Sequence, residues 1–156
     1  MKCTTCGHLT EVRAISEKLQ LGELRFVADL PAHVCPSCNE SFIDDFVVEA
    51  FERLVALTIL DEGLIGSATF RFLRQFAGLR ANELAALLSV DKATVSRWEN
   101  SRTPEATAFY SLCALVIERL SGEQVPSLRR TMEKVGAYQG ERSRTLRVGE
   151  ISASAA

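Results

Sequence analysis

The sequence predicts an α+β fold that is mainly α, with a small β module first and a domain of five helices after it. Four of the five cysteines form two CxxC pairs within residues 1–40. Two mixed apolar and polar runs lie between the pairs, on either side of Gly22, which favours a hairpin. From about residue 44 onward, apolar residues recur at helical spacing instead. A chain of 156 residues has room for one domain or two small ones.

The cysteine pairs are Cys3 with Cys6 in CTTCG, and Cys35 with Cys38 in CPSCN. A two-residue spacing lets a tight turn present both thiolates to one metal, and two such turns complete a tetrahedron around zinc. We therefore expect one structural Zn2+ per chain. Four thiolates close the coordination sphere, which leaves no open position for a catalytic water.

Disulfide bonds and a thioredoxin-like redox site are alternative roles for the four cysteines. Disulfides fit poorly with a cytoplasmic chain, and neither pair sits in a strand-to-helix unit of the thioredoxin kind. His8 and His33, each beside a pair, could replace a thiolate or donate to one, although histidines in such places are more often exposed. No convincing catalytic constellation occurs elsewhere in the chain, so we expect no enzyme.

Between the pairs, Glu11–Leu19 and Leu24–Leu30 are expected to form the hairpin. A helix follows from Asp44 to about Asp61, with Asp44 or Asp45 as its cap. Its apolar residues cover more than one stripe, so the helix either packs between the two halves or joins a partner. These residues are Phe46, Val47, Ala50, Phe51, Leu54, Leu57 and Ile59.

Two glycines in the segment EGLIGS interrupt the helical pattern and mark a boundary. We therefore divide the chain into a zinc-binding module with its connecting helix (1–62), a hinge (63–67), a DNA-binding domain (68–121) and a C-terminal extension (122–156).

Residues 72–104 predict two short helices joined by a tight turn. Leu84, Ala85 and Leu88 recur at helical spacing, and the pattern breaks at residues 89–91 before it resumes. Asp91 is the expected cap of the second helix, in which Val95 and Trp98 face inward. Its outer face carries Lys92, Thr94, Ser96 and Arg97, side chains that suit the base edges of a major groove. Asn100, Ser101 and Arg102, just beyond it, are candidates for phosphate contacts.

Flanking helices complete the predicted domain. The first spans about residues 68–77 and ends at Gly78, and another spans about 105–120, with an extra apolar face that suits a homodimer seam. Cys113 is expected in the core of the latter helix. A last helix is expected at about 126–135. Residues 138–156 have little to bury and are expected to be mobile, and their arginines, with Arg129 and Arg130, are favoured as a solvated tail over phosphate contacts.

The segment GLRANELAALLSVDKATVSRWEN (78–100) resembles the helix-turn-helix of Xre/Cro-type regulators. Three positions depart from that pattern: Ala81 stands where the family often has a phosphate-binding Gln, and Ser89 and Ser101 stand where Gly is usual. The resemblance implies that the domain dimerises on a palindromic operator.

A zinc module followed by an apolar helix and an Xre/Cro-like reader resembles the MqsA-type antitoxins, whose front module is a YgiT-type zinc finger. The resemblance covers about residues 1–120. It implies that Cys3, Cys6, Cys35 and Cys38 hold zinc and that Arg97 is the main base-reading side chain. The Asn with which this family can read adenine falls at Ala93 here. It also implies that the front module neutralises a small ribonuclease toxin, while the rear module represses the toxin-antitoxin operon.

Charge is divided along the chain in a way that fits this organisation. Net charge is −6 over residues 1–65, +3 over 66–104 and +1 over 105–156. An acidic front suits a basic partner such as an RNA-cutting toxin, and the basic charge lies with the reading helix. The chain has no apolar run long enough for a membrane and no signal-peptide core, so we expect a cytoplasmic protein without a membrane partner. A stand-alone zinc-containing regulator and, with least support, a redox or metal enzyme remain alternatives.

Overall fold

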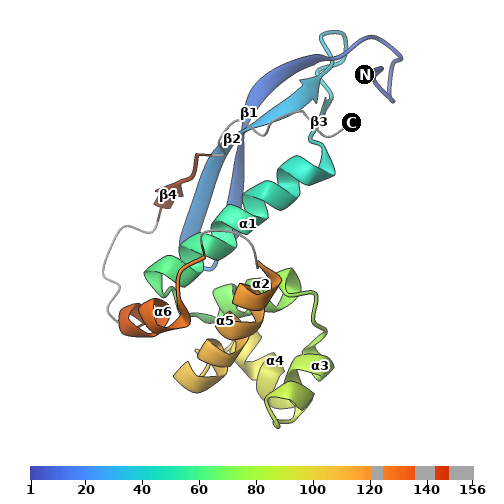
Figure 1. Cartoon of the computed structure of the whole chain (residues 1–156). Coiled ribbons are helices and arrows are strands. Elements are labelled where there is room, and N and C mark those ends of the chain that lie inside the picture. Colours follow the sequence, from blue (N-terminus) through green and yellow to red (C-terminus); the bar gives the residue numbers. More distant parts are fainter. Residues whose placement is uncertain (121–124, 136–142, 148–156) are drawn as a thin grey trace.

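The computed structural model describes residues 1–120, 125–135 and 143–147 (Figure 1). A long hairpin comes first and a cluster of short helices follows, so the predicted α+β fold, mainly α, is confirmed. The elements in chain order are β1 (Glu11–Leu21), β2 (Leu24–Val34), β3 (Ser41–Phe42), α1 (Asp45–Glu62), α2 (Ser67–Phe76), α3 (Ala81–Leu87), α4 (Lys92–Asn100), α5 (Ala106–Arg119), α6 (Leu128–Lys134) and β4 (Ser143–Thr145).

The hairpin is longer than predicted. Strands β1 and β2 pair in antiparallel register from Glu11 opposite Val34 to Leu21 opposite Leu24. Gly22 makes the turn with a φ of +63°, a left-handed backbone that only glycine adopts freely. Along β2 every second side chain is buried, which is the period of a strand with one face in the core. The buried residues are Phe26, Ala28, Leu30 and Ala32.

Strand β2 is the centre of the sheet, because the other three strands all pair with it. Strand β3 is antiparallel to the end of β2 at His33 and Val34, next to the cysteines. Strand β4 pairs in parallel with the other end of β2, beside Arg25 to Val27. The sheet therefore joins the first and last parts of the described chain.

Helix α1 lies between the hairpin and the other helices (Figure 1), so the prediction that it packs between the two halves is confirmed. One side of the helix faces β2 and the other faces α2 and α6. Phe46 and Val48, near its first turn, remain 52% and 37% exposed. The buried side chains of α1 are Val47, Phe51, Val55, Ala56, Ile59 and Leu60.

The expected cap of α1 is only half right. Asp44 occupies the N-cap position, but its carboxylate accepts no capping hydrogen bond. Instead its Oδ2 lies 3.4 Å from Nε2 of His33. The carboxylate therefore links the start of α1 to the end of β2, and Asp45 supplies the acidic charge in the first turn.

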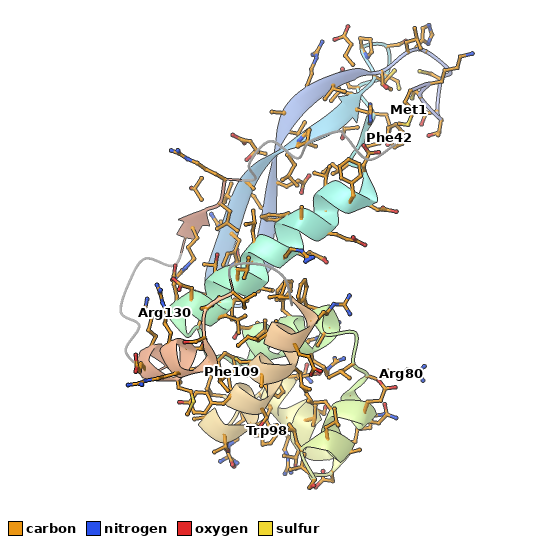
Figure 2. All side chains as sticks on the ribbon, in the orientation of Figure 1. Met1, Phe42, Arg80, Trp98, Phe109 and Arg130 are labelled. Atoms are coloured by element: carbon orange, nitrogen blue, oxygen red, sulfur yellow. The ribbon has the colours of Figure 1, made fainter. Side chains whose placement is uncertain are left out.

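A single apolar cluster runs through the molecule, from Phe26 in β2 to Leu120 after α5. Leu64, in the segment between α1 and α2, belongs to this cluster and is 3% exposed. At its far end Phe70 meets Trp98 edge-on, with ring centroids 5.8 Å apart. Figure 2 places Trp98 and Phe109 within the helical part. The division of the chain into 1–62, 63–67, 68–121 and 122–156 stays a prediction.

The C-terminal part differs from the expectation. Helix α6 is present at the predicted place, and its cap is Ser127, whose Oγ accepts from the Arg130 amide at 3.4 Å. The expectation of a mobile tail is wrong for Ser143–Thr145, which form β4. It is wrong for Arg144 too, because this side chain is 8% exposed and pairs with Glu62. Leu146 and Arg147 follow β4 in the described part, whereas residues 138–142 and 148–156 of that tail lie outside it.

In the described part of the chain, no helix is both long and apolar enough to cross a membrane.

Gly63 ends α1 with a φ of +64°, and a Cβ there would lie 2.6 Å from the Val135 amide nitrogen. Gly63→Ala should therefore lower the free energy of unfolding by roughly 2–4 kcal/mol, since it adds both backbone strain and a clash with main chain. Gly66→Ala is the matched control, because Gly66 is extended and its Cβ would meet only ordinary contacts. Urea unfolding of both variants measures the difference. Equal losses would contradict the close approach at Gly63.

Candidate functional site

The two cysteine turns have the same backbone conformation. In the first, the Gly7 amide donates to the Cys3 carbonyl at 2.9 Å and the Cys3 amide donates to the His8 carbonyl at 2.8 Å. The second turn repeats both bonds at the same distances, from Asn39 to Cys35 and from Cys35 to Glu40. Gly7 and Asn39, each just after the second cysteine of its pair, both have a positive φ, +77° and +58°. Such matched turns aim both sulfurs of a pair to one side.

The turns meet at the outer end of the hairpin and bring all four sulfurs together. The four Sγ atoms lie within 4.8 Å of one another. Individual separations are 3.6 Å for Cys3 to Cys38, 3.4 Å for Cys6 to Cys35 and 3.5 Å for Cys6 to Cys38. Sulfurs at the corners of a zinc tetrahedron lie about 3.8 Å apart, from Zn–S bonds of about 2.3 Å, whereas disulfide sulfurs lie about 2 Å apart. The four cysteines could hold one metal ion, and their arrangement is consistent with zinc.

Backbone amides surround the sulfurs and favour their ionised form. The amide of Cys6, helped by that of Thr5, lowers the pKa of the Cys3 thiol to about 6 against the effect of burial. At Cys38 the Glu40 amide also acts to lower the pKa, but the neighbouring sulfurs and burial outweigh it and raise the pKa to about 12. Crowded thiolates therefore resist full ionisation without a cation between them. A bound metal removes that resistance, because it binds the thiolate form.

Neither histidine joins the cysteine cluster. His8 is exposed. His33 is partly buried in β2 and faces Asp44. The sequence-based alternative in which a histidine replaces a thiolate is therefore not supported. Cys113, the fifth cysteine, is buried in α5 as predicted, and burial raises the pKa of its thiol to about 12.

Helices α3 and α4 form the predicted pair of short helices. Leu84 and Ala85 in α3 are buried, as are Val95 and Trp98 in α4. Asp91 caps α4, because its Oδ1 accepts from the Thr94 amide at 2.8 Å. This bond, first among several causes, lowers the pKa of the Asp91 carboxyl. The cap thus stabilises the helix above the ordinary pKa of an aspartate and is lost as the pH falls through the lowered value.

The face of α4 opposite Val95 and Trp98 is open to solvent. Lys92, Ser96 and Arg97 are exposed and Thr94 is partly exposed, so all four candidate base-reading side chains are accessible. Three other candidates follow around the end of the helix and are also exposed: Asn100, Ser101 and Arg102.

Hydrogen bonds already occupy several of these side chains. Arg97 Nη2 donates to Thr94 Oγ1 at 2.9 Å, and the Thr94 hydroxyl donates to Asp91 Oδ2 at 3.2 Å. The hydroxyl of Thr94 has a single hydrogen, and it is used for Asp91. Asn100 Nδ2 donates to the Ser96 carbonyl at 2.7 Å. Ser101 Oγ donates to the Arg97 carbonyl at 3.3 Å.

A buried ion pair holds α4 in place, and sequence reasoning missed it. Arg74 in α2 pairs through Nε and Nη2 with the Glu99 carboxylate, and its Nη1 donates to the Leu79 carbonyl at 2.6 Å. The two side chains are 11% and 8% exposed. An arginine at an otherwise inward position of α2 was the available signal, because arginine is almost never fully buried without a partner.

The two serines that replace the usual glycines behave differently. Ser89 has a φ of +53°, so it adopts the left-handed backbone, at a cost of about 1 kcal/mol for a non-glycine residue. Ser101 has a φ of −141° and carries no such strain. Of the two serines that stand where glycine is usual, only Ser89 therefore takes the left-handed conformation.

These elements define a helix-turn-helix domain behind a four-cysteine module. In agreement, the family model described as a helix-turn-helix domain matches residues 67–124. No curated protein and no solved structure matches the chain.

Cys35→Ser should abolish metal binding, because metal binding and folding of such a site share one free energy. For the same reason the amides at the outer end of the hairpin should lose their protection from hydrogen exchange. Cys113→Ser is the matched control, since Cys113 lies outside the cluster. Elemental analysis of the purified proteins should give one zinc per chain for the wild type and the control, and none for Cys35→Ser. Zinc retained by Cys35→Ser would contradict the site.

Proposed function

We propose that this protein is a transcriptional repressor that reads a palindromic DNA operator with helix α4. The observation that carries the proposal is the two-sided character of α4, with Val95 and Trp98 buried and Lys92, Ser96 and Arg97 exposed. A surface helix needs an apolar side to dock on its own domain and a polar side to enter a major groove. The net charge of +3 over residues 66–104 supplies attraction to phosphates.

Within this proposal the exposed residues take different roles. Arg97 reads a base edge, and Lys92 and Ser96 lie beside it. Thr94, expected from the sequence to contact bases, instead positions Arg97, since its hydroxyl hydrogen is committed to Asp91. Asn100, Ser101 and Arg102 meet phosphates around the end of the helix. A homodimer would place two copies of α4 about one DNA turn apart, and the protein would act in the cytoplasm, where its operator is.

We further propose that the protein is the antitoxin of a type II toxin-antitoxin system and that its cysteine module, folded around one structural Zn2+, binds a small ribonuclease toxin. The net charge of −6 over residues 1–65 supports a basic partner. Five of the seven large apolar side chains that are exposed in the described part of the chain also belong to residues 1–65, and they are available for contact with a protein partner. They are Met1, Leu9, Val12, Phe46 and Val48. The protein itself would carry out no catalysis.

A stand-alone regulator is the second candidate. The acidic charge of the front module and its exposed apolar side chains would also suit a basic protein partner of another kind. In this second case the front module would serve a partner other than a toxin, while α4 would act in the same way.

Arg97→Ala should cost roughly 1–3 kcal/mol of binding free energy and relax the preference at one base pair per half-site. Selection of binding sites from a random duplex library, followed by affinity measurements, gives both quantities. Thr94→Val should weaken the same preference less, because it frees the guanidinium without removing it. Arg129→Ala, an exposed arginine in α6, is the control. An equal loss on every sequence would contradict base reading by Arg97.

Coexpression with the product of the adjacent short reading frame should restore the growth of cells in which that product alone is toxic. The two proteins should then copurify through the cysteine module, so Cys35→Ser should lose the rescue while Arg97→Ala keeps it. If no neighbouring product is toxic, the stand-alone regulator is the better description.

A further inference from the structure

Three consecutive residues at the end of α1 each contact the C-terminal part of the chain. Asp61 Oδ1 accepts from Arg130 Nη2 of α6 at 2.9 Å. Glu62 Oε2 accepts from Arg144 of β4 twice, from Nε at 3.0 Å and from Nη2 at 2.8 Å. At Gly63 the main chain at the end of α6 approaches so closely that no Cβ would fit without a shift. Two ion pairs and one close main-chain contact therefore join the C-terminal part of the chain to the point where α1 leads into α2.

The same C-terminal residues also reach both halves of the molecule. Strand β4 pairs with β2 of the front module, and the Leu146 amide donates to the Val27 carbonyl at 2.7 Å. Helix α6 packs against α1 and against α5 of the helix-turn-helix domain, with Thr131 fully buried. In Figure 1 α6 lies beside the end of α1, and β4 lies beside the hairpin. The C-terminal part of the chain thus contacts the front module, the α1–α2 junction and the helix-turn-helix domain.

The Arg144–Glu62 pair is well suited to fix this arrangement. The Arg144 side chain is 8% exposed and the Glu62 side chain is 33% exposed. A largely buried ion pair contributes little net stability, because both ions lose hydration, but moving one partner away leaves the other charge poorly solvated. The pair therefore favours one relative position of β4 and α1 over nearby alternatives.

We propose that residues 125–135 and 143–147 form a clamp on the α1–α2 junction, which makes the cysteine module and the helix-turn-helix domain open and unfold as one unit. Gly63 and Gly66 border this junction and would otherwise allow the two parts to change their relative orientation. The clamp holds the cysteine end of the hairpin at a fixed place relative to α4. This inference stands independently of which partner the front module binds.

Hydrogen exchange of the full-length protein in increasing urea tests the clamp. In the wild type, amides of β2 and of α4 should lose protection at the same urea concentration, because the two parts open together. In Arg144→Gln the two midpoints should separate. Arg129→Gln, which removes an exposed pair within α6, is the matched control and should keep the midpoints together.

Fluorescence of Trp98, the only tryptophan of the chain and 5% exposed, reports unfolding of the helical part independently. A variant that ends at Val135 keeps α6 but lacks β4, and it should show the same separation if Arg144→Gln fails to fold. The proposal is wrong if the midpoints already differ in the wild type. It is equally wrong if the β2 and α4 midpoints remain equal both in Arg144→Gln and in the variant that ends at Val135. The C-terminal residues would then only add stability.

Discussion

The two-sided burial of α1 is the constraint on which the rest of the structure depends. Val47 and Ala56 lie on opposite sides of the helix and both are buried, so the helix must be covered by the sheet on one side and by other helices on the other. That requirement places the hairpin and the helix-turn-helix domain around a single core. It also sets the cysteine cluster at the outer end of the hairpin, far along the chain path from α4, so that the two candidate sites do not share residues.

The two sites use different physical means to become rigid. The cysteine end has few buried apolar side chains, and a metal bound by four thiolates would supply the free energy that the core does not. Helix α4 is held instead by Val95 and Trp98 in the core, by the Asp91 cap and by the buried Arg74–Glu99 pair. The outward side chains of α4 are consequently displayed from a fixed backbone, which is what recognition of base edges requires.

Local patterns were predictable from the sequence, and distant pairings were not. The sequence alone indicated the cysteine turns, the Asp91 cap and the inward position of Val95 and Trp98. Each of these features depends only on residues within about one turn of the chain. Arg74–Glu99 and Arg144–Glu62 join residues 25 and 82 positions apart, and no local pattern identifies such partners. Strand β4 escaped notice because three residues bury too little to give a periodic signal. Asp44 was assigned a cap from its position, whereas the fold brings it to His33.

The central claim is that DNA binds at the exposed side of α4, while the cysteine end of the hairpin stays free for another partner. Backbone amide NMR of the zinc-loaded protein, titrated with a selected duplex, tests it most directly. The account predicts that chemical shifts change for residues 91–102 and the start of α3, and that the amides around Cys3 and Cys35 do not change. Shift changes centred on the cysteine end, with α4 unaffected, would contradict it.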